Sequence, residues 1–129
     1  MVFHPGIAAT DAASGTGDVD YRLQRRALLA DLEAGRIARH EVCDAHPELV
    51  RVARNCETPD GGACPVCDFD GLAWIHYVFG PRLPASGKLA LTDTELDRYR
   101  QRSGDFAAYR VEVCASCGWH HLLRRIVLG

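Results

Sequence analysis

The sequence lacks the features that would place a chain on bulk nucleic acid or in a membrane. Its 129 residues carry a formal net charge of -2, so there is no general positive field, and a contact with nucleic acid would need a local patch. No apolar run is long enough to cross a bilayer. Residues 1–6 show neither the basic nor the apolar region of a secretory signal. We therefore expect a cytoplasmic protein.

The remaining composition is that of an ordinary globular chain. Hydrophobic residues make up 47% and charged residues 25%, which suits one compact domain or two very small ones. A core of this modest size gains from a cross-link. The six cysteines come without a secretory signal, which favours a reducing compartment, where paired thiols hold metal more often than they form disulfides.

Four of the cysteines form two Cys-x-x-Cys pairs, Cys64 with Cys67 and Cys114 with Cys117. Each pair places two thiols on a tight turn, and four thiolates are the number that a tetrahedral structural zinc site needs. Because no coordination position stays open, the ion is expected to be structural rather than catalytic. Gly118 after the second pair would let backbone N–H groups approach the sulfurs. The sequence therefore predicts one structural Zn²⁺ in a zinc ribbon.

The periodicity predicts an α+β fold in which an N-terminal bundle of short helices precedes a zinc-ribbon-like antiparallel sheet with a helical insertion. We expect a flexible tail over residues 1–18, a three-helix segment over 19–57 and the ribbon over 58–129, with the insertion at about 81–104. Helices are predicted over residues 20–34, 39–44 and 47–54, and a capping box at Thr92 and Glu95 predicts another to about residue 102. Strands are expected over 72–79, 106–113 and 119–128.

An enzymatic interpretation is available but weak. In zinc deaminases a His-x-Glu motif and a Pro-Cys-x-x-Cys motif supply the metal ligands and a proton shuttle. His46 and Glu48 resemble the first motif, but Ala63 precedes Cys64 where that motif has proline. The interpretation also leaves the second cysteine pair without a role, so we expect no enzyme.

Other cysteines and histidines leave a second metal site open. His40, Cys43 and His46 recur every three residues, and Cys56 could join them or the ribbon. A helix with one buried cysteine and two surface histidines explains the same pattern and is favoured. Redox switches of the anti-sigma type place a histidine four residues before Cys-x-x-Cys. Here that residue is Asp60, which argues against such a switch.

The segments Val-Cys-Asp-Ala-His-Pro-Glu-Leu at 42–49, Cys-Pro-Val-Cys at 64–67 and Val-Glu-Val-Cys-Ala-Ser-Cys-Gly-Trp-His-His-Leu at 111–122 carry a resemblance. On these residues the chain resembles an actinobacterial family of small cytosolic domains of unknown function. The resemblance covers nearly everything after the tail. It implies that the four cysteines are a family feature, and it brings no catalytic residue. The cysteine turns also resemble those of zinc ribbons in transcription and translation proteins, an argument by fold analogy.

These observations predict a non-enzymatic zinc-ribbon adaptor that binds a large cytosolic assembly, RNA polymerase or the ribosome. Direct nucleic-acid binding through the helical half is the alternative, and a deaminase-like enzyme is a distant third. Tryptophan and arginine often anchor interfaces, so the expected contact residues lie on the first helix and on the last strand: Arg22, Arg25, Arg26, Trp119, His120, His121, Arg124 and Arg125.

Overall fold

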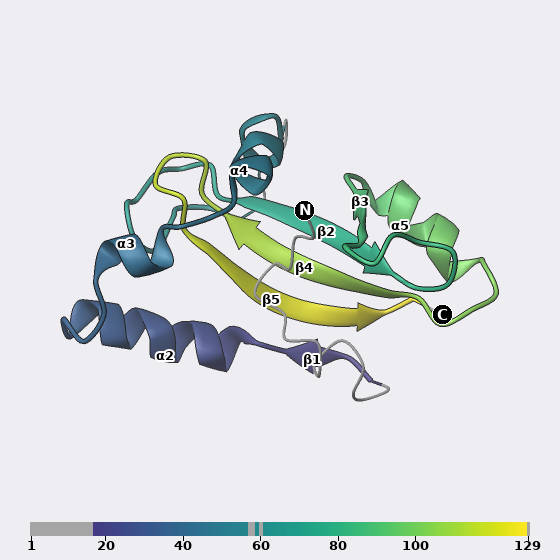
Figure 1. Ribbon diagram of the computed structural model, residues 1–129, viewed down its shortest axis with the longest axis horizontal. Helices are drawn as coiled ribbons and strands as arrows, with labels where there is room; N and C mark the ends of the chain where they lie inside the picture. Colours follow the sequence, from purple (N-terminus) through teal and green to yellow (C-terminus); the bar gives the residue numbers. More distant parts are fainter. Residues whose placement is uncertain (1–16, 57–58, 60, 129) are drawn as a thin grey trace.

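A computed structural model describes residues 17–56, 59 and 61–128 of the chain. It is a mixed α+β structure, as predicted, built on one five-stranded antiparallel sheet with the strand order β1-β5-β4-β2-β3 (Figure 1). The elements follow the chain as β1 (Val19–Asp20), α2 (Arg22–Glu33), α3 (Arg39–Val42), α4 (Pro47–Arg54), β2 (Ala73–Phe79), β3 (Lys88–Ala90), α5 (Asp93–Arg100), β4 (Ala107–Val113) and β5 (His120–Val127).

The predicted helices all form, and local sequence explains their ends. After α2, Gly35 adopts a φ of +77° and donates its N–H to Leu32 O, while the next N–H bonds Asp31 O, which is the Schellman arrangement expected of a C-terminal glycine. Pro47 opens α4, and the side chain of His46 accepts the N–H of Glu48. These short-range signals suffice to predict helix positions.

The insertion is also capped as predicted. The Thr92 hydroxyl accepts the N–H of Glu95 at 3.2 Å and so starts α5. The insertion adds a short strand, β3, that the sequence analysis did not predict. This strand pairs with β2 through His76 and Ala90 and forms one edge of the sheet.

The helices pack on the sheet, not mainly on one another. Leu49 and Ala53 of α4 share one cluster of buried side chains with Ile75, Val111 and other residues of the central strands. Because side chains alternate along a strand, Glu112 points to the opposite face from Val111. There it meets Arg25 of α2, whose Nε lies 2.6 Å from the carboxylate. Helices α4 and α2 therefore pack against opposite faces of the sheet.

A second buried cluster includes residues from both sides of the predicted boundary between residues 57 and 58. It joins Val42 of α3 to Cys64, Leu72, Cys114 and Trp119, with apolar residues of α2 packed against it. A third lies at the other end of the sheet, beneath α5. The helical segment and the cysteine-bearing segment thus complete each other's buried surfaces.

Residues 1–16 of the predicted tail lie outside the described residues. The last two residues of that predicted tail are hydrogen-bonded to β5. The carbonyl of Gly17 accepts a hydrogen bond from Arg125 Nη1 at 2.5 Å, and the Asp18 carboxylate accepts the N–H of Val127 at 2.7 Å. These contacts lead into β1, which pairs with Arg124 and Arg125 at the second edge of the sheet. A strand of two residues carries too little pattern to be predicted.

Candidate metal centre

Two turns of the same geometry carry the four predicted thiols. In the first knuckle, residues 64–69, the N–H of Cys64 donates to Phe69 O at 2.9 Å and the N–H of Asp68 donates to Cys64 O at 3.0 Å. The second knuckle, residues 114–119, has the same two bonds: the N–H of Cys114 donates to Trp119 O at 2.8 Å, and the N–H of Gly118 donates to Cys114 O at 3.0 Å. The two halves of the split cysteine motif are therefore structural equivalents.

The fifth residue of each knuckle adopts a left-handed backbone. Gly118 has a φ of +88°, as its lack of a side chain permits, whereas Asp68 reaches +66° with a side chain. In the second knuckle this turn directs the N–H groups of Cys117 and Trp119 toward the sulfurs of Cys114 and Cys117, both at 3.4 Å. The predicted role of Gly118, to let backbone N–H groups approach the sulfurs, agrees with this geometry.

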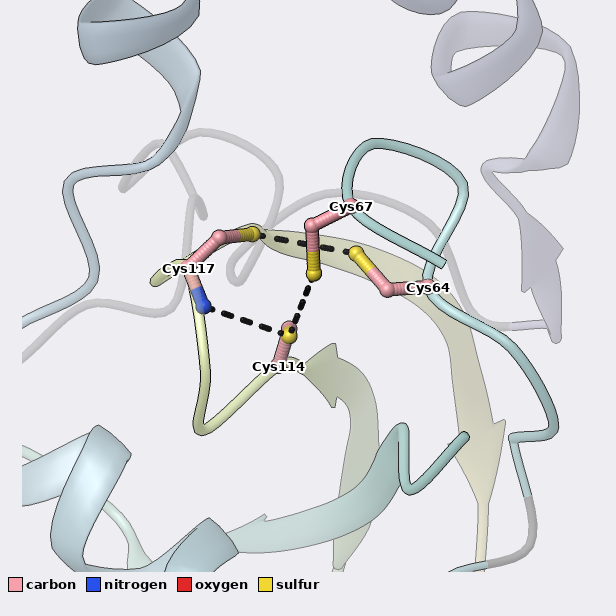
Figure 2. Close-up of side chains that lie close together, drawn as sticks. All are labelled: Cys64, Cys67, Cys114 and Cys117. Carbon is pink, nitrogen blue, oxygen red and sulfur yellow. Dashed lines mark hydrogen bonds between the residues drawn. The ribbon is translucent and has the colours of Figure 1, made fainter. Parts of the chain in front are cut away.

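The four sulfurs converge between the two knuckles (Figure 2). All of them lie within 4.8 Å of one another. Cys64 Sγ is 3.8 Å from Cys117 Sγ, and Cys67 Sγ is 3.5 Å from Cys114 Sγ. In a tetrahedral site with metal–sulfur bonds of about 2.3 Å, sulfurs are separated by about 3.8 Å. The arrangement therefore fits one metal ion held by four thiolates.

Burial and local hydrogen bonds act on these thiols in different directions. Burial raises the pKa of the Cys64 thiol to about 11 and also raises the pKa of Cys117. At Cys67 burial acts in the same sense, but the N–H of Phe69 and the neighbouring thiols outweigh it and lower the pKa to about 7. A cation that binds the four sulfurs must displace the protons that these thiols still carry.

A fifth cysteine lies beside the four. The thiol of Cys43 donates to Cys117 Sγ at a sulfur–sulfur distance of 3.5 Å. Arg39, one turn earlier, interacts with both of these thiols, and the interaction with Cys43 is the largest influence that raises the pKa of its guanidinium. The periodicity of residues 40, 43 and 46 pointed to Cys43, but nothing local in the sequence placed it against the second knuckle.

Trp119 was expected to be an exposed contact residue, and this expectation is wrong. Its side chain is fully buried, with 0% of its surface exposed. The indole N–H donates to Glu112 Oε2 at 2.6 Å, and the same oxygen accepts Arg25 Nε at 2.6 Å. Trp119 thus fills the core behind the second knuckle, and the sequence analysis missed its buried partner Glu112.

The three predicted arginines of α2 line one hollow, of about 300 Å³. Arg22 pairs with Asp20, Arg25 pairs with Glu112, and Arg26 is exposed. Trp74 of β2 lies on the same hollow. We refer to Arg22, Arg25, Arg26, Trp74 and the neighbouring Arg110 as the arginine–tryptophan surface.

Two members of this surface were not predicted. The Trp74 side chain is 37% exposed, and the guanidinium of Arg110 lies 4.8 Å above its ring. Alternation along β2 could have indicated this position, because Ala73 and Ile75 on either side are both buried. A large aromatic residue between two core positions of a strand lies on the opposite face.

The other predicted contacts of β5 are only partly available at the surface. Arg125 is buried, contrary to expectation, and Arg124 lies 3.6 Å from Asp18. His120 bonds the carboxylate of Asp44 at 3.1 Å. His121 is partly buried and stacks on Trp119, and burial lowers its pKa. The exposed part of this strand is therefore smaller than predicted.

The residues of the deaminase-like motif have other partners. His46 caps α4, and the Glu48 carboxylate pairs with Arg51 at 2.6 Å on the surface. Cys56 packs against the cluster beneath α4, and His40 is exposed. Among the described residues, the four knuckle cysteines form the single group of three or more potential ligands, so a second site is not assembled there.

Within the described residues, no helix has both the length and the apolar character needed to cross a membrane.

Comparison with known proteins identifies relatives but no function. The model of a family of unknown function, DUF5318, matches residues 14–129. The chain is 42% identical over 111 residues to the uncharacterized protein Rv0049 of Mycobacterium tuberculosis (strain ATCC 25618 / H37Rv) and to the uncharacterized protein Mb0050 of Mycobacterium bovis, matches that cover 86% of this chain and 81% of each relative. No solved structure matches the chain significantly.

Proposed function

This chain belongs to the DUF5318 family of unknown function, and from that premise we propose that it is a non-enzymatic zinc-ribbon adaptor of the cytoplasm. Its zinc would be structural, and its arginine–tryptophan surface would dock on a large assembly, RNA polymerase or the ribosome. The observation that carries the proposal is a closed group of four thiols that joins the two knuckles at the end of the sheet where β4 leads into β5.

The chemistry of the ligands supports zinc. An all-sulfur tetrahedral set is typical of Zn²⁺ or of iron–sulfur sites, and four cysteines in a closed shell are a common structural zinc site. Four thiolates fill the coordination shell, so no position remains for a substrate or an activated water. The ion would hold the start of β2 to the start of β5, and the arginine–tryptophan surface would bind the partner.

The arginine–tryptophan surface supports docking. Tryptophan and arginine are the residues that most often supply binding energy at interfaces. The pair of Trp74 and Arg110 is already stacked, and Arg25 is held by Glu112. Such side chains lose little conformational freedom when a partner binds.

Direct nucleic-acid binding is the second candidate, and the combination of Arg26 with Trp74 on one hollow favours it. Guanidinium groups track a phosphate backbone, and an exposed indole can stack on a base. The overall charge of -2 restricts such binding to this local patch.

The leading proposal is tested by affinity purification from a native lysate. The tagged full chain is compared with a variant that carries Arg26→Ala and Trp74→Ala. A matched control carries Arg98→Ala and Leu91→Ala, which are exposed positions outside the surface. We expect RNA polymerase or ribosomal subunits with the wild type and the control, but not with the surface variant. Recovery of neither assembly would contradict the adaptor proposal.

Three further measurements separate the alternatives. Elemental analysis should give one zinc per chain, and less than about half a zinc would refute the metal assignment. A steep fall of RNA or DNA affinity with salt would favour the second candidate, because each neutralised phosphate releases counterions. Deaminase turnover that Glu48→Gln abolishes would overturn the non-enzymatic proposal.

A further inference from the structure

The fifth cysteine, Cys43, has no assigned role in the proposed centre. It ends helix α3, and its Sγ lies 3.5 Å from Cys117 Sγ, as close as the thiols within the group of four are to one another. It does not belong to the group of four whose sulfurs all lie within 4.8 Å of one another. Cys43 is therefore in contact with one ligand and outside the ligand set.

The backbone holds this contact in place. The residue before it, Val42, is buried with Trp119 in the cluster behind the knuckles. Two residues later, the N–H of Ala45 donates to Gly118 O at 3.0 Å. A Cβ built on Gly118 would come within 3.0 Å of Cys43 O, which shows how closely the two segments pack. The approach of Cys43 to the second knuckle is thus part of the fold.

We propose that Cys43 and Cys117 form an oxidation site, in which hydrogen peroxide joins the two sulfurs in a disulfide and so opens the metal centre. The sulfurs would have to approach by about 1.5 Å, since a disulfide bond is about 2.05 Å long. Arg39 lies beside both thiols, so the pair is held between a helix end and the second knuckle. The inference rests on the zinc part of the proposed function.

The chemistry balances with peroxide as the oxidant. One sulfur of the pair attacks the O–O bond, which breaks to give a sulfenic acid and one water. The second sulfur then attacks the sulfenic sulfur, forms the S–S bond and releases a second water. In the zinc-loaded chain, the Cys43 thiol and the zinc-bound Cys117 thiolate together lose two electrons and one proton. With that proton and one more from solvent, one peroxide is reduced to two waters. Zinc would lose Cys117 and keep three thiolate ligands, so a chelator could remove it more easily.

The test uses the zinc-loaded full chain with hydrogen peroxide and a chromophoric chelator. Peptide mass spectrometry locates the disulfide while the chelator reports released zinc. We expect a Cys43–Cys117 disulfide together with zinc release, both reversed by a dithiol. Cys43→Ser keeps a hydrogen-bond donor near Cys117 but cannot form the disulfide, so it should release zinc several-fold more slowly. Cys56→Ser is the matched control, because Cys56 packs in a different cluster, and it should behave as the wild type.

Three results would overturn the inference. One is zinc release from Cys43→Ser at the wild-type rate, and another is a disulfide confined to the four ligands. The third is a loss of zinc stoichiometry in Cys43→Ser before oxidant is added, which would make Cys43 a ligand. A wild-type chain without zinc would contradict the proposed metal instead. Mass spectrometry of that metal-free chain would still decide the inference, since a Cys43–Cys117 disulfide supports it and another pairing opposes it.

Discussion

Replacement of Glu112 by alanine should destabilise the protein far more than the loss of an ordinary surface charge. The Glu112 side chain is 3% exposed, and one of its oxygens accepts both the indole N–H of Trp119 and Nε of Arg25. Removal of the carboxylate leaves the buried indole N–H without a partner, which costs about 1–3 kcal/mol. Arg25 is partly exposed and can turn to water when the carboxylate is removed. The loss of this ion pair therefore adds about 1 kcal/mol to the destabilisation, less than the loss of a fully buried pair.

The free energy of unfolding of Glu112→Ala should therefore fall by about 2–4 kcal/mol, or about 8–16 °C in Tm. Urea unfolding, followed by tryptophan fluorescence at saturating zinc, measures the change. The matched control is Glu48→Ala, which removes an ion pair with Arg51 whose side chains are 62% and 61% exposed. That variant should lose far less stability than Glu112→Ala, because solvent screens an exposed ion pair. If the two variants were equally stable, the reasoning about the buried carboxylate would be refuted.

Three further predictions concern the metal centre. Removal of zinc by a chelator should abolish the cooperative melt, because a structural zinc site contributes about 10–16 kcal/mol, comparable to the whole stability of about 5–15 kcal/mol of a typical protein; an unchanged melt would show that the site is not structural. Gly118→Ala should lower stability by about 1–3 kcal/mol, because the φ of Gly118 is +88° and the new Cβ would meet Cys43 O. Asp68→Gly should instead raise stability by up to about 1 kcal/mol. Urea titrations should show stability changes of opposite sign in the two variants, and changes of the same sign would contradict the equivalence of the knuckles. Zinc affinity, measured by competition with a chromophoric chelator, should decrease as the pH falls, because protons compete for the thiolates, and an affinity independent of pH would argue against thiolate ligands.

Features that depend on a few neighbouring residues were predictable from the sequence. Two Cys-x-x-Cys pairs on turns indicated a common metal group, and the four sulfurs do converge. Thr92, Pro47 and Gly35 marked helix ends, because capping depends on residues within one turn of the helix. The α+β class followed from the switch between helical and alternating patterns.

Features that depend on strand pairing or on contacts between distant residues were not predictable. Trp119 resembled a surface anchor because its partner Glu112 lies on the neighbouring strand, and strand register is not visible in one sequence. That register also shifts between Arg110 and Val111, and such a shift disrupts simple alternation. The contact of Cys43 with Cys117 spans 74 positions, a separation that only the folded chain closes.

The position of β5 in the sheet has a consequence for synthesis of the chain. Strand β1 and helix α2 are made before β5, yet β1 pairs with β5 and α2 packs beside it. The bond from Arg125 to Gly17 joins residues 108 positions apart. At about 5–20 residues per second, the first-made segment would wait about 5–20 s for its partner strand. During that interval the apolar side of α2 would be open to chaperones, and the second knuckle would not yet exist to complete the metal group.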